Sequence, residues 1–183
     1  MPATTRGTGG SVTKYVAFLR AINVGGHTIL KMADLKRMFE SFGLENVQTS
    51  IQSGNVIFES EADTLEKRIE SQLEKTSGYK IKLFVRTMRE LQSIVSKSPF
   101  TATAAETVFV AFLNKKPDRK NQQVLLALIS EADDFAVKGR EVYNLRRDRE
   151  KSVFSPNFVE KILKLPVTTR NMTTLTKIVD KYK

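Results

Sequence analysis

The chain contains no cysteine and no tryptophan, only one histidine, and no long apolar run. Without cysteine there are no disulfide bonds or thiolate metal sites, so core packing must stabilise the fold, which suits a reducing cytoplasm. The single histidine, His27, excludes a multi-histidine metal centre. No window approaches the roughly 18 consecutive apolar residues that a membrane span needs. We therefore predict a cytoplasmic protein with no metal, no cofactor and no membrane association.

The composition is that of a packed globular protein with an excess of positive charge. Of 183 residues, 40% are hydrophobic and 27% are charged, which is far from the signature of disorder. The net charge is +10, of which +6 falls in residues 140–183, where eleven basic residues face five acidic ones. This skew favours polyanionic partners, nucleic acid first, although a solvated surface without a partner explains it equally well.

Hydrophobic periodicity and turn residues divide the chain into two halves with the same order of elements. The first half predicts strand, helix, strand, strand, helix and strand at 14–20, 32–42, 47–52, 56–59, 63–77 and 80–86. The second half predicts the same order at 107–114, 118–131, 135–138, 141–145, 155–163 and 167–169. Asp63, Ser155 and Asn171 stand where helix caps are expected. The strand at 80–86 alternates charged and apolar residues, which predicts half exposure.

The order β-α-β-β-α-β in each half predicts an α+β fold with two ferredoxin-like domains in tandem, each an antiparallel sheet with helices on one face. The expected organisation is a flexible leader at 1–13, a first domain at 14–86, a linking helix at 87–98 and a second domain at 99–183 with an extra C-terminal helix. The halves share no visible sequence identity, so the duplication is inferred from element order alone.

Two turns of the first half are expected to form an anion site, because the first two strands of such a unit run parallel and their following loops emerge at one end of the sheet. Amide side chains, glycine-freed backbone N–H groups and a guanidinium would meet there. The candidate residues are Arg20, Asn23, Gly25, Gly26, His27, Gln52, Ser53, Gly54 and Asn55. The alternative is that these glycines only close a loop and a hairpin.

A second candidate lies at the start of the last helix, where Thr169, Arg170 and Asn171 would place hydroxyl, guanidinium and amide groups at the positive helix end. Helix capping plus one surface arginine is the alternative interpretation. As a general acid or base, His27 would need an orienting carboxylate, and Asp34 is the nearest in sequence; a surface histidine is the default.

The central strands predicted at 15–19 and 55–59 lack the aromatic series on which RNA recognition motifs stack bases. Any nucleic acid is therefore expected to bind through its phosphates.

Several segments together resemble a bacterial domain-of-unknown-function family numbered 1697. They read YVAFLRAINVGG at 15–26, KMADL at 31–35, IQSGNVIF at 51–58 and TRN at 169–171. The resemblance covers nearly the whole chain after residue 13 and implies two ferredoxin-like domains in one bacterial cytosolic protein, with no established activity. One departure is Met172, where the family often has tryptophan; that side chain would either pack the halves together or stack on a ligand.

The favoured hypothesis is a basic binding protein for a phosphate-bearing ligand, either nucleic acid or a nucleotide. The alternatives are a small-molecule enzyme with a polar site between the halves, in which Arg20 or Arg170 holds substrate, and a protein-interaction module with exposed sheet edges. No pair of nucleophile and base in the sequence supports catalysis, and nothing in it indicates an oligomeric state.

Overall fold

The computed structural model describes residues 10–20, 22, 29–50 and 54–183. The elements of the first half are β1 (Thr13–Leu19), α1 (Met32–Ser41), β2 (Glu45–Ser50), β3 (Asn55–Ser60), α2 (Glu66–Ser77), β4 (Leu83–Thr87) and α3 (Met88–Ser96). Those of the second half are β5 (Thr107–Leu113), α4 (Arg119–Leu126), β6 (Asp133–Lys138), β7 (Glu141–Arg146), α5 (Pro156–Leu163), β8 (Val167–Asn171) and α6 (Met172–Tyr182). Each half thus repeats one order of elements and ends in a helix.

The strands form two four-stranded antiparallel sheets with the same connectivity, in the orders β2-β3-β1-β4 and β6-β7-β5-β8. The registers also correspond, because Val16 of β1 faces Arg86 of β4 and Val110 of β5 faces Arg170 of β8. The protein is therefore an α+β fold in which both halves share one strand order.

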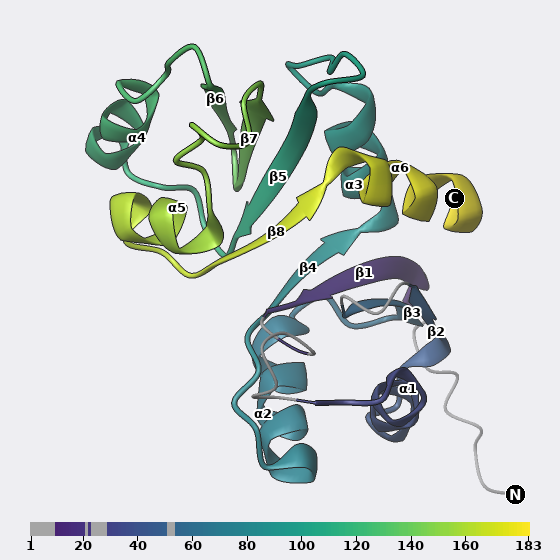
Figure 1. Ribbon diagram of the computed structural model, residues 1–183. Coiled ribbons are helices and arrows are strands. Elements are labelled where there is room, and N and C mark those ends of the chain that lie inside the picture. Colours follow the sequence, from purple (N-terminus) through teal and green to yellow (C-terminus); the bar gives the residue numbers. More distant parts are fainter. Residues whose placement is uncertain (1–9, 21, 23–28, 51–53) are drawn as a thin grey trace, which may run out of the picture.

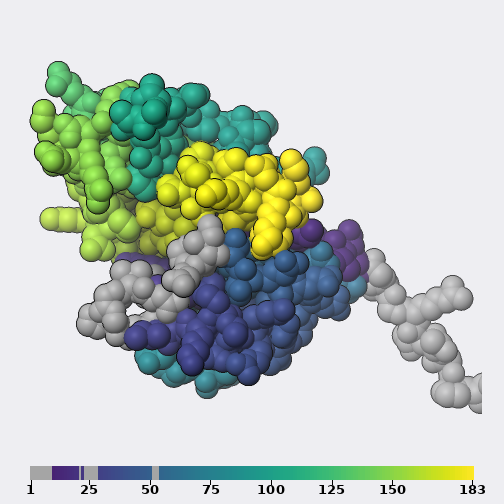
Figure 2. Space-filling model, turned by 45° about the vertical axis from the view of Figure 1, so that its right-hand side comes forward, coloured from purple at the N-terminus to yellow at the C-terminus, as the bar shows by residue number. Residues whose placement is uncertain are grey.

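Three hydrophobic clusters make the core, and the middle one belongs to both halves. In β1 the side chains alternate: Ala17 packs with α1 and α2, whereas Phe18 packs toward the second half. The Phe18 ring stacks on Phe112 of β5 with centroids 4.2 Å apart. Helices α3 and α6 lie side by side and complete this shared core (Figure 1). Figure 2 shows the C-terminal residues spread over the junction of the halves. The central strands β1 and β5 are thus covered on both faces.

Two of the three predicted helix caps are confirmed. Ser155 accepts a hydrogen bond from the Phe158 amide, and Asn171 accepts one from the Thr174 amide. The expected cap by Asp63 is wrong, because α2 is preceded by Leu65 with no side-chain cap.

Helix α2 instead protects the edge strand β4 with its carboxylates. Glu66 accepts a hydrogen bond from the Val85 amide at 2.8 Å, and Glu70 accepts one from the Leu83 amide at 3.1 Å. These contacts occupy backbone groups that an exposed sheet edge would offer to another chain.

Two further predictions from periodicity are wrong. The strand expected at 80–86 to be half-exposed begins at Leu83 and is buried from Leu83 to Arg86, because the second half covers its outer face. The helix expected at 118–131 ends at Leu126 and buries only Leu125. Val124, Leu128 and Ile129 are exposed.

Candidate functional site

Half of the twelve predicted site residues are described by the structure. Asn23, Gly25, Gly26, His27, Gln52 and Ser53 lie outside the described residues. The described ones are Arg20, Gly54, Asn55, Thr169, Arg170 and Asn171. They come from both predicted clusters, at opposite ends of the sequence.

The end of β1 lies beside the hairpin turn that precedes β3, since the Leu19 amide donates a hydrogen bond to the Gly54 carbonyl at 2.9 Å. Gly54 has a φ of +77°, and a Cβ at this position would lie 2.6 Å from Cδ1 of Ile22. Only glycine fits both the positive φ and the close approach of the Ile22 side chain. The turn is therefore built for tight packing against β1.

Arg170 joins the two predicted clusters into one. Its Nε donates to Oδ1 of Asn55 at 2.6 Å, and its Nη2 donates to the Leu19 carbonyl at 2.9 Å and to the Gly54 carbonyl at 3.5 Å. Its Nη1 donates to the carbonyl of Thr169 in its own strand at 2.8 Å. A side chain of the second half thus holds the end of β1 and the hairpin of the first half.

The environment of Arg170 is that of a core residue. The side chain is 8% exposed, and its Cζ lies 5.5 Å from the centroid of the Phe18 ring. Burial lowers the pKa of Arg170 to about 10, because the charged guanidinium loses hydration. This geometry fastens the halves together, and ligand binding by Arg170 stays a prediction.

Arg86 makes the reciprocal set of contacts from the first half. Its Nε donates to Oε1 of Glu141 at 2.6 Å, and its Nη2 donates to the carbonyls of Leu113 at 2.8 Å and Arg140 at 3.3 Å. Its Nη1 donates to the Val85 carbonyl at 2.9 Å. Burial lowers the pKa of Arg86, and the Glu141 carboxylate opposes this shift.

The two arginines therefore occupy equivalent places in the two halves. Each sits one residue before the end of the last strand of its own half. Each binds the last carbonyl of the first strand of the other half, together with the hairpin turn of that half. The correspondence between the halves thus extends from the order of their elements to the contacts between them.

The remaining described site residues also make contacts within the protein. Arg20 forms an ion pair with Glu160 of α5, with Nη2 and Oε2 2.7 Å apart. Asn171 caps α6 through its contact with the Thr174 amide. The capping interpretation of the second predicted cluster therefore accounts for Asn171, whereas Arg170 is not a surface residue.

A separate group of basic side chains gathers where α4 begins and α5 ends. The Asn121 side chain near the start of α4 donates to the carbonyl of Leu163, the last residue of α5, with Nδ2 and O 3.3 Å apart. The six exposed cations of these segments are Lys115, Lys116, Arg119, Lys120, Lys161 and Lys164, which we call the basic surface.

The basic surface carries a high local charge. Across the part of the chain that the structure describes, none of its six cations forms an ion pair. Asp118, which caps α4 by accepting from the Asn121 amide, is the one carboxylate in the segment 114–121. The sequence prediction did not include this surface. The adjacent cations Lys115-Lys116 and Arg119-Lys120 can be seen in the sequence and indicate local positive charge. Their proximity to α5 cannot be seen there.

Neither a metal nor a membrane site is found among the described residues. No group of three or more His, Asp or Glu side chains in these ranges could hold a metal ion. No described helix has both the length and the apolar composition needed to cross a bilayer.

Comparison with known proteins identifies the family of this chain and a solved structure with a similar fold. The model of the family described as "Protein of unknown function (DUF1697)" matches residues 12–143. The chain belongs to this family. Among solved structures, this DUF1697 protein is similar to a conserved bacterial protein, SP0830 from Streptococcus pneumoniae, with a TM-score of 0.73 and 21% identity over 94% of this chain and 100% of that chain. That likeness concerns the fold. The comparison with curated proteins found no match.

Proposed function

We propose that this DUF1697 protein binds nucleic acid through its phosphates, using the basic surface. The observation that carries the proposal is the convergence of six exposed cations at the junction of α4 and α5, with Asp118 as the one carboxylate in the segment 114–121. Such a cluster is the electrostatic footprint of a phosphate-binding face.

The burial of both sheets supports a phosphate-led contact over base stacking. In modules that stack bases on a sheet, one face of the central strands is open. Here β1 and β5 are buried on both sides, by helices on one face and by the shared core on the other. The described central strands therefore offer no open face for base stacking, and helices and loops are expected to make the contacts.

The number of cations sets the expected salt dependence. For a single strand, log K falls with log salt by about 0.7 for each phosphate neutralised. Six contacts would give a slope of about 4, so affinity would fall about 300-fold between about 50 and 200 mM salt. Two contacts would give only about a sevenfold fall over the same range.

A fluorescence-anisotropy titration with labelled RNA and DNA strands of about a dozen nucleotides tests this proposal. The test variant carries Lys115→Gln, Lys116→Gln, Arg119→Gln and Lys120→Gln. A matched variant removes the same charge from the first half through Lys36→Gln, Lys67→Gln, Lys75→Gln and Lys80→Gln. All eight side chains are exposed, so both variants should fold like the wild type.

The test variant should lose most of the affinity, and its salt slope should fall by about 3, whereas the matched variant should keep most of both. Equal losses of affinity in the two variants would mean that net charge alone, and not the basic surface, causes the binding. An absence of salt-sensitive binding to either nucleic acid would overturn the proposal.

We also propose that each half is a ferredoxin-like domain. The order β2-β3-β1-β4 and the βαββαβ succession support this assignment, and both recur in the second half. A cytoplasmic location is proposed as well, and the absence of cysteine supports it.

A further inference from the structure

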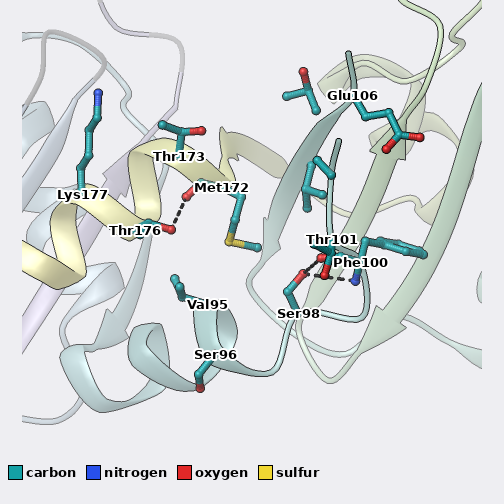
Figure 3. Close-up of a pocket in the computed structure, with 13 residues that line it drawn as sticks. Val95, Ser96, Ser98, Phe100, Thr101, Glu106, Met172, Thr173, Thr176 and Lys177 are labelled. Atoms are coloured by element: carbon teal, nitrogen blue, oxygen red, sulfur yellow. Dashed lines mark hydrogen bonds between the residues drawn. The ribbon is translucent and has the colours of Figure 1, made fainter. Parts of the chain in front are cut away.

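A cavity of about 660 Å³ lies away from the basic surface. It opens between the end of α3, the segment 98–102, the start of β5 and the first turns of α6 (Figure 3). Its size falls within the range of small-molecule sites, about 300–1,000 Å³. The cavity is therefore large enough for a compact organic ligand.

The inner wall of this cavity is apolar. Val95, Phe100, Val108 and Met172 line it. Val108 is buried, while Val95, Phe100 and Met172 pack partly against the core shared by the halves. An aromatic ring or an aliphatic body would be favoured here, because it would cover apolar surface that is now partly exposed to water.

The polar groups at the rim are of two kinds. Some are already engaged within the chain: the Ser98 hydroxyl contacts the backbone of Phe100, and the Thr176 hydroxyl donates to the Met172 carbonyl. The Glu106 carboxylate accepts from the Thr103 amide at 2.9 Å and lies 3.6 Å from Nε of Arg147.

The second kind has no partner within the described chain. Thr173 and Lys177 stand one helical turn apart at the start of α6, and both line the cavity. Neither side chain forms a hydrogen bond or an ion pair with another described residue. Lys177 is thus a charged side chain of the rim without an ion pair to a described residue, and Thr173 contributes a hydroxyl one turn before it.

We propose that this cavity binds a small molecule with an apolar ring and one anionic group. The ring would lie against Met172, and the anion would lie toward the Thr173 hydroxyl and the Lys177 ammonium at the start of α6 (Figure 3). This inference is independent of the nucleic-acid proposal, because the two sites use different elements.

Two fluorescent probes distinguish the contribution of the apolar wall from that of the positive charge. Anilinonaphthalene sulfonate has an aromatic body and one anionic group, and phenylnaphthylamine has a similar body without charge. Amide NMR spectra of the isotope-labelled full chain would first locate each probe. The largest shifts should fall on the segment 98–102 and on Thr173 and Lys177.

Three variants then test the assignment by titration. Lys177→Gln should weaken the anionic probe about fivefold and leave the neutral probe unchanged. Lys181→Gln, one turn further along α6 and outside the cavity, should change neither. Ala102→Trp places a large ring at an exposed lining position, so it should weaken both probes at least about tenfold without disturbing the core.

Several results would overturn the inference. One is a set of shifts confined to α4, whose Val124 and Leu126 are also exposed. Another is an unchanged affinity of both probes for Ala102→Trp. An equal loss of the anionic probe in Lys177→Gln and Lys181→Gln would show attraction by charge alone and would remove Lys177 from the site.

Discussion

Replacing Arg170 by methionine should destabilise the whole protein, because this side chain fastens the second half to the first. Methionine keeps an aliphatic stem near the Phe18 ring but removes every hydrogen bond of the guanidinium. The two short bonds across the junction, to Asn55 and to the Leu19 carbonyl, both involve a charged donor and buried acceptors.

The expected loss follows from those two bonds. A hydrogen bond to a charged group contributes about 1.5–3 kcal/mol, which gives about 3–6 kcal/mol for the pair. Part of this is offset because the guanidinium no longer has to be buried, as the lowered pKa of Arg170 indicates. We expect a net decrease of about 3 kcal/mol in the free energy of unfolding.

Urea unfolding followed by circular dichroism measures this change. With an m-value of about 2 kcal/mol/M, the midpoint should fall by about 1.5 M. Arg20→Met is the control, because Arg20 makes one partly exposed ion pair and should cost less than about 1 kcal/mol. Arg170→Lys should retain little of this stability, since the ammonium of lysine cannot reproduce the planar set of N–H donors of the guanidinium. If Arg170→Met costs no more than Arg20→Met, the fastening role is wrong.

Two other substitutions test the fold at particular atoms. Gly54→Ala should lower the free energy of unfolding by at least about 2 kcal/mol, measured by thermal or urea unfolding, because its φ is positive and its Cβ would collide with Ile22. Gly139→Ala is the control, because its φ is positive but it has no such contact, and it should lower the free energy of unfolding by about 1 kcal/mol. Equal losses in the two variants would contradict the packing argument. Burial raises the pKa of Tyr143 from 10.0 to about 12, so the stability this group contributes is full below about pH 10 and is lost as the pH rises toward 12. The stability difference between wild type and Tyr143→Phe should therefore shift by about 1 kcal/mol between about pH 9 and 11, and an unchanged difference would refute the raised pKa.

The same geometry affects how ligand binding can be tested. Asn55 and Arg170 were predicted to bind an anion, but both are buried and hydrogen-bonded to each other. A variant that removes them would lose affinity through unfolding as readily as through the loss of a contact. Substitutions on the exposed basic surface avoid this ambiguity.

The sequence by itself determined the local elements and their order. Periodicity placed the helices, and the caps at Ser155 and Asn171 lie where short-range hydrogen-bond chemistry puts them. The glycines at 54 and 139 marked the two hairpins, because each turn needs a positive φ. These features depend on neighbours within a few residues, so the linear pattern contains them. Family membership was likewise carried by short segments of the chain.

Only the tertiary structure decided what lies between the halves. A buried arginine and a surface arginine look alike in sequence, and the burial of Arg170 depends on Asn55, which lies 115 residues away. The strand at 83–87 is buried on its outer face because a second sheet packs there, and its alternating pattern gave no sign of that sheet. The basic surface also needs α4 and α5 to meet. Long-range packing brings together residues whose spacing in the chain carries no signal, and both proposed binding sites depend on it.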